Sequence, residues 1–526
     1  MIGFVQQNLA ELFAQIPISA DSPMGISETR IISITNDSRA VQPGFLFVAH
    51  EGGTSDGHQY IPQAIKNGAA AVVGTQDLSE VGVPYVRVAN SREALAYLSA
   101  AFYGFPARRL TVIGVTGTDG KTTTANLIYQ ILMTAGKQVG IISTINALIG
   151  DETLDTGLHV TTPDAPDIQR YLGRMLSAGL THVVLESTSH GLAQHRVTGC
   201  EFDIGVVTNI THEHLDFHGT YEAYRAAKAR LFTSLEQTHP KPQGNPRLAV
   251  LNQDDQSYDY LSDVVKVNQV AYSLSQTEKG IWAEDIYHDP SGMHFTACGP
   301  DFRFVVDSTL IGDYNVSNCL AAIAATVVGL GVDQEAARLG IAALHSVPGR
   351  MERIDLKQNF LAIVDFAHTP NALRVTLEMA RKMTRGKVIA IFGSAGLRDR
   401  QKRRMMAEEA VGLADITFLT AEDPRTESLD EILAEMAEAA KIKGGIEGQT
   451  FFVVKDRGEA LRRAVSLAQE NDLVITCGKG HEQSMCFGLV EYPWDDRTAM
   501  TAAISERLGI KGPEMPYLPT QDILSS

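Results

Sequence analysis

The feature that most restricts how this chain can fold is a glycine-rich loop between an apolar run and a helical stretch. Residues 110–115, LTVIGV, have the β-branched character of a buried strand, and residues 122–135 have a helical pattern. The connecting segment is TGTDGK. Backbone N–H groups in such a loop surround phosphate oxygens, a lysine supplies positive charge, and a hydroxyl can hold Mg²⁺. The segment therefore predicts a nucleotide-binding domain.

The match to the strict phosphate-loop pattern is imperfect, because Val115 stands where that pattern has its first glycine. The competing interpretation is a turn that only links a strand to a helix, and the Lys-Thr pair at the start of the helix disfavours it. We expect contacts to ATP from Gly117, Thr118, Asp119, Gly120, Lys121, Thr122 and Thr123.

Composition limits the class of protein. A chain of 526 residues exceeds what one hydrophobic core usually organises, so we expect about three domains. A hydrophobic content of 44% is typical of a globular enzyme, and a net charge of -17 disfavours nucleic acid as a partner. The five cysteines form no CxxC pair, which argues against a disulfide framework and a structural zinc site.

The sequence also predicts where the protein works. The longest apolar runs fall short of the roughly 18 residues that span a bilayer, and the first residues lack a basic region and a cleavage site. Together with the cysteine pattern, this predicts a cytoplasmic protein that is neither exported nor inserted into a membrane.

The alternation of apolar runs and helical stretches divides the chain into three α/β domains, 1–106, 107–346 and 347–526. The first combines strands at 45–49 and 70–73 with helices near 62–66 and 92–102. In the second, strands at 183–185, 204–207 and 248–251 predict a parallel sheet covered by helices. In the third, strands at 362–364, 388–392, 416–419, 451–454 and 473–476 predict an open doubly wound sheet.

Three segments depart from this alternation. Residues 281–310 predict short antiparallel strands appended to the second domain, and residues 239–246, HPKPQGNP, predict a loop. The tail after Gly512 contains three prolines and predicts a loosely held end.

A polar cluster, ESTSHGLAQHR, begins at Glu186, directly after a predicted buried strand. A carboxylate at the carboxyl end of a strand, beside a phosphate loop, is suited to Mg²⁺. Taken alone, Glu186 could equally be a polar residue at a strand end, and the phosphate loop favours the ligand. The later segment NITHEHLDFHG does not support a zinc protease, because HExxH would need histidine where Asp216 stands.

The order of motifs resembles the Mur ligase family, specifically the UDP-N-acetylmuramoyl-tripeptide synthetases. The motifs are TGTDGKTTT, ESTSHGLAQHR, NITHEHLDFHG, YEAYRAAKARLF, GDYNVSN, VPGRME, VDFAHTPNAL and GKGHE, and the resemblance extends from NDSRAVQPGFLFVA to about Leu508. It implies a domain for the UDP end, a P-loop-type central ATPase domain and a Rossmann-like C-terminal domain that brings the amino acid. It also implies a ligase that uses ATP and an acyl phosphate to add a diamino acid to the D-Glu of UDP-N-acetylmuramoyl-L-Ala-D-Glu, in peptidoglycan precursor synthesis.

The resemblance assigns residues to substrates and ions. It implies contacts to the UDP-muramoyl dipeptide from Asn36, Ser38, Gly53, Thr54, Ser55, Thr161, Thr162, Thr188, Gln194 and Arg196, and further contacts to ATP from Asn315, Arg350, Asp365 and His368. It implies catalytic roles for Lys121, Glu186, His214 and Lys228. Thr122, Glu186, His214 and a Lys228 carbamylated by CO₂ would surround Mg²⁺, since a carbamate offers oxygen ligands where an ammonium would repel the ion.

The amino-acid pocket is where this sequence departs from the family. The implied residues are Arg398, Glu422, Asp423, Pro424, Arg425, Gly478 and Glu482. Members that select meso-diaminopimelate carry Asp-Asn-Pro-Arg where this chain has Glu-Asp-Pro-Arg. Arg425 can hold a distal carboxylate, which favours meso-diaminopimelate over L-lysine or L-ornithine. Asp423 replaces an amide with a negative charge, which could repel that carboxylate or accept an ammonium. The stretch SAGLRDRQKRR also replaces the more usual GGDRDKGKRP.

Two other functions remain as alternatives. A folylpolyglutamate or cyanophycin synthetase would share the phosphate loop and the metal residues, but the NDSR and HGLAQHR motifs argue against it. A nucleotide-dependent switch that forms no amide bond is disfavoured because four residues are retained together, namely Lys121, Glu186, His214 and Lys228. We expect small-molecule substrates as partners, and a monomer.

Overall fold

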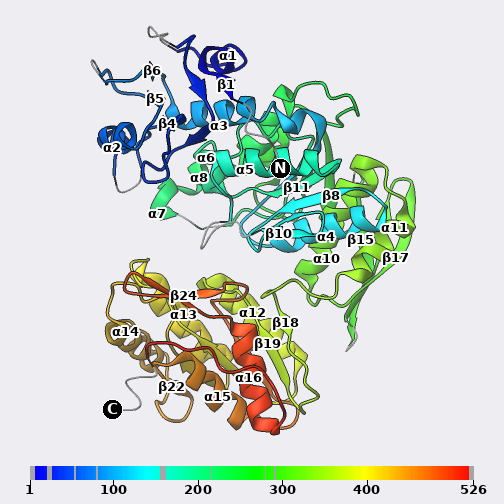
Figure 1. Ribbon diagram of the computed structural model, residues 1–526. Helices are drawn as coiled ribbons and strands as arrows, with labels where there is room; N and C mark the ends of the chain where they lie inside the picture. Colours follow the sequence, from blue (N-terminus) through cyan, green and yellow to red (C-terminus); the bar gives the residue numbers. More distant parts are fainter. Residues whose placement is uncertain are drawn as a thin grey trace. The chain divides into compact units, whose positions relative to one another are not determined.

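The computed structural model describes residues 6–20, 26–52, 55–78, 81–154, 161–211, 213, 215–278, 280–289 and 292–520, apart from the side chains of residues 215 and 216. The chain forms two compact units, and Figure 1 labels many of their elements. The first unit comprises Met1–Ser308 and Asp313–Leu344. The second comprises Thr309–Gly312 and His345–Ser526.

The first unit begins with a parallel sheet of the order β3-β4-β5-β6. Helices α1 and α3 bury one of its faces, and α2 buries the other. The strands and helices predicted between residues 45 and 102 are confirmed. The elements are β1 (Gln7–Asn8), α1 (Leu9–Ala14), β2 (Arg30–Ile31), β3 (Ser33–Thr35), β4 (Phe45–Val48), α2 (Ile61–Lys66), β5 (Ala71–Gly74), β6 (Tyr85–Arg87) and α3 (Ser91–Phe102).

The rest of the first unit is built on a mixed sheet of the order β10-β9-β8-β11-β7-β12-β13-β14-β15-β16-β17. From β8 to β15 in this order, neighbouring strands are parallel. The strands are β7 (Thr111–Thr116), β8 (Val139–Ile142), β9 (Ala147–Ile149), β10 (Glu152–Leu154), β11 (His182–Glu186), β12 (Ile204–Val207), β13 (Leu248–Asn252), β14 (Asn268–Ser273), β15 (Gly280–Asp289), β16 (Gly292–Gly299) and β17 (Phe302–Ser308). The predicted parallel sheet and the appended antiparallel strands, β15–β17, are confirmed.

Strand β7 shows why this sheet forms. All of its residues are buried, as expected of a central parallel strand covered on both faces. Because β7, β11 and β12 are parallel, their carboxyl ends lie at one edge of the sheet. The covering helices are α4 (Lys121–Thr134), α5 (Ala165–Ser177), α6 (Ser189–Ala193), α7 (Leu215–His218), α8 (Tyr221–Thr233), α9 (Tyr258–Val264), α10 (Asp313–Ile323), α11 (Gln334–Ala343) and a π-helical turn, Ala324–Val328.

The second unit is a doubly wound sheet of the order β18-β19-β23-β20-β21-β22, as predicted. Helices α12–α14 cover one face, and α15 and α16 cover the other. The elements are β18 (Glu352–Arg353), β19 (Leu361–Val364), α12 (Pro370–Met383), β20 (Val388–Phe392), α13 (Arg400–Leu413), β21 (Ile416–Leu419), α14 (Leu429–Ile442), β22 (Phe451–Val453), α15 (Arg457–Leu467), β23 (Leu473–Thr476), the hairpin β24 (Ser484–Phe487) and β25 (Val490–Pro493), and α16 (Asp496–Leu508).

The prediction of a loosely held tail is wrong for residues 513–520. Leu518 is fully buried, and the Thr520 hydroxyl donates a hydrogen bond to Asp456 at 2.7 Å. Prolines prevent a helix there, but an extended segment can still bury its side chains. Residues 521–526 lie outside the described part. Among the helices described, none combines the length and apolar character needed to cross a membrane.

Candidate active site

The phosphate loop, residues 117–120, joins β7 to α4 and depends on two glycines. Gly117 has a φ of 150° and Gly120 a φ of 79°, which L side chains rarely adopt. A Cβ atom at Gly117 would collide with the Thr208 hydroxyl, and one at Gly120 with the Asn318 amide. Only glycine fits both positions, and the loop so formed ends at the positively polarised N-terminus of α4.

Polar groups that follow β12 hold the loop in place. The Asn209 side chain accepts a hydrogen bond from the Asp119 N–H at 2.9 Å, and its carbonyl accepts one from the Thr118 N–H at 2.7 Å. The Lys121 ammonium donates to the Thr118 carbonyl at 2.7 Å. The ammonium group therefore lies beside the loop, where phosphate groups bind in such folds.

Glu186, the last residue of β11, meets the first turn of α4. Both of its carboxylate oxygens lie 3.1 Å from the Thr122 hydroxyl, and one accepts a hydrogen bond from the Thr144 N–H at 3.1 Å. Thr122 is 3% exposed and Glu186 is 1% exposed. A buried hydroxyl and carboxylate at one point form the hard-oxygen environment that Mg²⁺ prefers.

Lys228 brings a second lysine to the same loop from α8. Its amine donates a hydrogen bond to the Gly117 carbonyl at 2.6 Å and lies 4.6 Å from the centre of the Tyr224 ring. The residue is 1% exposed. Burial, and then the charge of Lys121, lower the pKa of Lys228 well below its usual value. Lys228 is therefore a buried amine with a strong tendency to be neutral.

Asn315 is linked to α4 through a neighbour on its own helix, α10. Its side-chain oxygen accepts a hydrogen bond from the Asn318 amide at 2.9 Å, and Asn318 accepts one from the Thr124 hydroxyl at 3.2 Å. Asn318 stands three residues further in the motif GDYNVSN, on the same face of the helix. That spacing is the signal that could have identified it.

A second polar cluster adjoins Glu186. The Thr162 hydroxyl lies 3.2 Å from the Glu186 carbonyl and 3.0 Å from the Thr188 hydroxyl, and it accepts a hydrogen bond from the Thr188 N–H at 3.0 Å. Thr188 also caps α6. The Arg196 guanidinium donates to the Thr162 carbonyl at 2.8 Å. The structure therefore joins these predicted substrate contacts to the end of β11.

Asp164, which we did not predict, connects this cluster to the N-terminal sheet. Its carboxylate lies 3.3 Å from Arg196 and accepts a hydrogen bond from the Asn36 amide at 3.1 Å. Gln194 accepts two hydrogen bonds from Arg196, at 2.8 and 3.1 Å. Asn36, Gln194 and Arg196, assigned to the same substrate, therefore belong to one network. An acidic residue just after the assigned Thr161 and Thr162 was the available signal.

Other predicted residues are placed less tightly. Ser38 is buried, and its carbonyl accepts a hydrogen bond from the Asn67 amide at 2.8 Å. Ser55 is exposed, and its carbonyl accepts a hydrogen bond from the Gly52 N–H. Gly53, Thr54 and His214 lie outside the described residues. Within the described part, no three or more His, Cys, Asp or Glu side chains gather as a metal site.

In the second unit, Asp365 organises the segment that follows β19. Its carboxylate accepts hydrogen bonds from the N–H groups of Met351 and Ala367, both at 2.8 Å, and from the Thr376 hydroxyl at 3.2 Å. These bonds tie the chain beside Arg350 to the turn that carries His368. Burial, and then the charge of Lys402, lower the pKa of His368 to about 3, so the imidazole is neutral.

Glu422 follows β21 and is 7% exposed. Its Oε2 has no hydrogen-bond partner among the described residues. Burial raises its pKa to about 7, although the charges of Arg457, Lys402 and Lys479 act in the opposite direction. Gly478 has a φ of 108°, and a Cβ atom there would collide with the Glu422 carboxylate. The structure therefore places Glu422 and Gly478 in contact, as expected of one pocket.

Asp423, where the sequence departs from the family, is buried and paired. Both carboxylate oxygens lie 3.0 Å from the Lys479 ammonium, and one accepts a hydrogen bond from the Cys486 N–H at 2.9 Å. Lys479 also lies 2.5 Å from the Glu482 carboxylate. Burial opposes the charge of Lys479, but Glu482 and Asp423 outweigh it and raise its pKa. We did not predict a role for Lys479, although it stands inside the motif GKGHE.

Arg425 and Arg398 lie on two loops that touch. The Asp423 carbonyl accepts a hydrogen bond from the Gly396 N–H at 3.0 Å, and the Arg425 guanidinium donates to the Gly396 carbonyl at 3.4 Å. Arg398 is exposed on the loop 394–399. Pro424 lies between the charged residues, and its carbonyl accepts a hydrogen bond from the Glu427 N–H at 3.1 Å.

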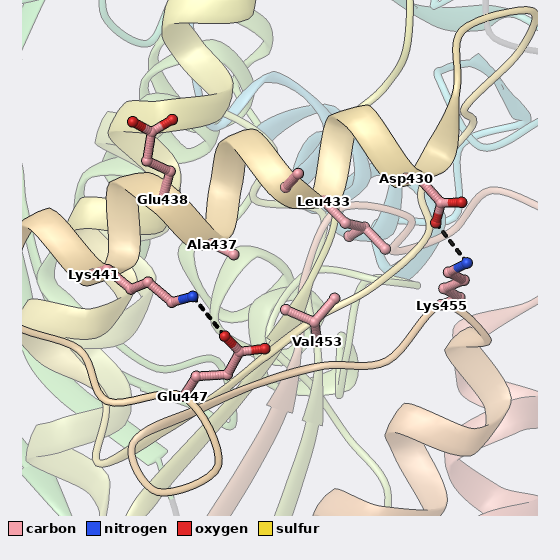
Figure 2. A pocket seen from close by; sticks show the side chains of 9 residues that line it. Asp430, Leu433, Ala437, Glu438, Lys441, Glu447, Val453 and Lys455 are labelled. Atoms are coloured by element: carbon pink, nitrogen blue, oxygen red, sulfur yellow. Dashed lines mark ion pairs between the residues drawn. The ribbon is translucent and has the colours of Figure 1, made fainter.

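A cavity of about 400 Å³ elsewhere in the second unit contains none of the predicted residues. Figure 2 shows its two ion pairs, Lys441 with Glu447 at 2.7 Å and Lys455 with Asp430 at 2.6 Å. Pairs between half-exposed side chains contribute little to stability or recognition. We therefore assign the chemistry to the residues around the phosphate loop and to the pocket that contains Glu422 and Asp423.

The phosphate loop, the buried Thr122–Glu186 pair and the parallel sheet define an ATP-using enzyme. Residues 30–103 match the description "Mur ligase family, catalytic domain", residues 115–326 match "Mur ligase middle domain", and residues 349–480 match "Mur ligase, glutamate ligase domain". The UDP-N-acetylmuramyl-tripeptide synthetase of Roseiflexus sp. (strain RS-1) is 42% identical over 92% of this chain and 96% of its own. The chain therefore belongs to the Mur ligase family, as an ATP-dependent ligase that forms amide bonds.

Three further likenesses refine the comparison. The UDP-N-acetylmuramoyl-L-alanyl-D-glutamate--2,6-diaminopimelate ligase of Geobacillus thermodenitrificans (strain NG80-2) is 40% identical over 91% of this chain and 95% of its own. A solved structure with the same protein name aligns over 96% of this chain and 100% of its own, with a TM-score of 0.65 and 30% identity. A folylpolyglutamate synthase of Mycobacterium tuberculosis aligns over 81% and 96%, with a TM-score of 0.60 and 15% identity, and shares the fold alone.

Proposed function

We propose that this protein adds meso-diaminopimelate to the D-Glu carboxylate of UDP-N-acetylmuramoyl-L-Ala-D-Glu, at the expense of ATP, in peptidoglycan precursor synthesis. The observation that carries the proposal is a cluster of four residues around the phosphate loop, Lys121, Thr122, Glu186 and Lys228. The retained Arg425 and the 40% identity to a relative named for 2,6-diaminopimelate support the choice of amino acid.

The proposal divides the work among three domains, 1–106 for the UDP end, 107–346 for ATP and 347–526 for the amino acid. Asn36, Ser38, Gly53, Thr54 and Ser55 would contact the uridine nucleotide. The muramoyl dipeptide and its phosphates would be held by Thr161, Thr162, Thr188, Gln194 and Arg196. Arg196 is suited to phosphate because a guanidinium donates planar, paired hydrogen bonds.

ATP would bind with its phosphates on residues 117–123 and with Asn315, Arg350, Asp365 and His368 around the rest. The neutral imidazole of His368 would then act as a hydrogen-bonding or stacking group rather than as a cation. The Thr122 hydroxyl and the Glu186 carboxylate fit Mg²⁺, because both are buried oxygen ligands beside the loop. His214 and the carbamate of Lys228 would complete the ligands. When bound, the ion would offset the negative charge of the phosphates.

Lys228 fits the proposed carbamate for a chemical reason. Only a neutral amine attacks CO₂, and burial beside Lys121 favours the neutral amine. Attack of the amine on CO₂ releases a proton and leaves an anionic carbamate, which would be attracted to the charge of Lys121. It would also place oxygen atoms, instead of an ammonium, next to the loop that receives ATP.

In the proposed reaction, the D-Glu carboxylate attacks the γ-phosphate of ATP in line, which releases ADP and leaves an acyl phosphate. Lys121 offsets the charge that develops on the transferred group. The amine of the amino acid then attacks the acyl carbon, loses a proton, and expels phosphate to leave the amide. Donors around the loop stabilise the oxyanion of the tetrahedral intermediate.

The amino acid would be held by Arg398, Glu422, Asp423, Pro424, Arg425, Gly478 and Glu482. Arg425 would bind the distal carboxylate of meso-diaminopimelate, a group that L-lysine and L-ornithine lack. We also propose that the protein acts as a monomer on small-molecule substrates in the cytoplasm, where ATP is available.

The test is phosphate release by the purified protein with ATP, Mg²⁺ and UDP-N-acetylmuramoyl-L-Ala-D-Glu, with meso-diaminopimelate, L-lysine or L-ornithine added in turn. We expect turnover that requires both acceptors and is fastest with meso-diaminopimelate. Fast turnover with L-lysine alone would move the proposal to a different amino acid. Phosphate release that ignores both acceptors would contradict ligation and support a nucleotide-dependent switch.

A further inference from the structure

The Asp423–Lys479 pair changes how the amino-acid pocket is balanced. We infer that Lys479 is a positioning residue, which neutralises Asp423 and thereby leaves Arg425 available to a carboxylate of the incoming amino acid. This inference rests on the function proposed above, and it concerns the one position at which the pocket carries an acid in place of the family's amide.

The contacts of Lys479 are those of a buried counter-ion for two carboxylates. Its side chain is fully buried, and its ammonium meets both carboxylate oxygens of Asp423 at 3.0 Å and the Glu482 carboxylate at 2.5 Å. The Asp423 side chain is 7% exposed, so water cannot screen it, whereas that of Glu482 is 20% exposed. A buried carboxylate without a partner is strongly unfavourable, so Asp423 depends on Lys479 more than Glu482 does.

The same carboxylate shapes the loop that carries Arg425. Asp423 and Arg425 have φ angles of 38° and 53°, which non-glycine residues adopt only when other contacts compensate. The hairpin of β24 and β25 supplies those contacts. Asp423 accepts from the Cys486 N–H at 2.9 Å, the Arg425 N–H donates to the Cys486 carbonyl at 3.1 Å, and the Arg425 carbonyl accepts from the Gly488 N–H at 2.8 Å.

Loss of the Lys479 charge would act on Arg425 through Asp423. The Asp423 carboxylate would keep the Cys486 N–H but lose the charge of Lys479, two residues from Arg425 and on the same edge of β24. It would compete with the substrate's carboxylate for the guanidinium and repel that carboxylate as well. An asparagine at 423 would remove this competition, because its amide oxygen could still accept from the Cys486 N–H without a charge.

This reasoning predicts a specific rescue. The variants are Lys479→Met, Asp423→Asn and the double variant, each assayed for the KM of meso-diaminopimelate and the KM of ATP. We expect Lys479→Met to raise the KM of meso-diaminopimelate by about 30-fold. Asp423→Asn removes one proposed substrate contact but introduces no competing charge, so it should raise this KM by only about 3-fold. The double variant should return within about 5-fold of the original protein. The KM of ATP should stay constant throughout.

Lys455→Met is the matched control. It removes the same charge from an ion pair of similar length, 2.6 Å to Asp430, but Lys455 is half-exposed and lines the cavity of Figure 2. We expect no change in either KM. If the loss of any lysine charge in this unit raised the KM of meso-diaminopimelate, Lys455→Met and Lys479→Met would raise it alike.

Three outcomes would overturn the inference. They are an unchanged KM in Lys479→Met, a double variant as impaired as the single one, and an equal rise in the KM of ATP. If Lys479→Met does not fold, the inference predicts that Asp423→Asn restores folding and a near-normal KM, and a double variant that also fails to fold overturns it. The original protein, assayed in the same series, separates the two proposals. If it does not use meso-diaminopimelate at all, the proposed function fails, whereas an active original protein with an unchanged Lys479→Met refutes only this inference.

Discussion

The phosphate loop and the amino-acid loop, residues 422–425, are each contacted by a buried lysine from another part of the chain, and the pKa values of these two lysines are shifted in opposite directions. Lys228 donates to the Gly117 carbonyl, and burial, followed by the charge of Lys121, lowers its pKa far below the usual value. Lys479 is equally buried, but two carboxylates lie within 3.0 Å and raise its pKa. The difference shows that charged neighbours, and not burial alone, decide what a buried lysine can do. The first suits chemistry at the amine, and the second suits charge balance.

The two loops also differ in how they reach unusual backbone conformations. The phosphate loop uses Gly117 and Gly120, which adopt positive φ without strain. The amino-acid loop uses Asp423 and Arg425, whose positive φ depends on hydrogen bonds to the β24 hairpin. A common group such as phosphate can be recognised by backbone, whereas a particular amino acid requires side chains whose charges are balanced. The predictions below test this contrast, from the largest expected effect to the smallest.

The largest effect is expected in the phosphate loop. Lys121→Ala should lower kcat for ligation by about 10⁴-fold, because a cation beside the transferred phosphoryl group contributes effects of this order. Steady-state phosphate release measures it. Lys137→Ala serves as the control and should keep full activity, because Lys137 is exposed and lies just after the end of α4. A Lys121→Ala variant with normal kcat would remove the lysine from the mechanism.

Lys228→Ala should lower kcat by about 10³-fold, since one preorganised group is lost. Short-chain carboxylates such as acetate or formate should restore part of the activity, because they can supply the oxygen atoms of the proposed carbamate. Lys266→Ala, an exposed lysine, is the control. An inactive variant that carboxylates fail to rescue would argue for the amine itself, and full activity would remove Lys228 from the reaction.

Glu422 should reveal itself through the pH dependence of stability. Burial raises its pKa from 4.5 to about 7. Between these pH values the carboxyl group is protonated in the folded state and ionised in the unfolded state. The folded protein therefore loses stability as pH rises from about 4.5 to about 7, by about 3 kcal/mol in all. Glu422→Gln should be more stable than the original protein at pH 8, and the gap should narrow toward pH 5. Urea unfolding at both pH values measures the gap, and a gap independent of pH would contradict the raised pKa.

The smallest effect is expected at the side chain that reads the amino acid. Arg425→Ala should raise the KM of meso-diaminopimelate by about 30-fold, near 2 kcal/mol, and leave that of L-lysine unchanged. Arg404→Ala is the control, because Arg404 is a partly exposed arginine of α13 that lies 3.9 Å from Glu438. An unchanged KM for meso-diaminopimelate would show that Arg425 does not bind the distal carboxylate.

The sequence predicted the parts of the fold that depend on local pattern. The strand, loop and helix around Gly117 follow from β-branched residues, obligatory glycines and a helical period, all of them visible in a short window. The doubly wound sheet of the second unit follows from repeated buried strands. The packed tail was missed, because the burial of Leu518 depends on residues far away in the sequence.

The site was predictable only where a motif carries it. The position of Asp164 beside Thr161 and Thr162 could have drawn attention to the residue. Its contacts to Asn36 and Arg196 join segments more than a hundred residues apart, and no local spacing indicates them. Lys479 meets Asp423 from a different strand end, so the charge at 423 could be weighed from sequence only as an isolated carboxylate. Long-range pairing of charges is the information that a single sequence lacks.

The central claim is that the residues around the phosphate loop activate the D-Glu carboxylate as an acyl phosphate. The amine of the amino acid, bound at the amino-acid loop, attacks only afterwards. It can be tested with UDP-N-acetylmuramoyl-L-Ala-D-Glu whose reacting carboxylate carries ¹⁸O on both oxygens, together with ATP and meso-diaminopimelate. The account predicts that mass spectrometry of the released phosphate finds one ¹⁸O in each molecule, and that the amide retains the other. Released phosphate without ¹⁸O would contradict the acyl phosphate and the role given to the phosphate loop.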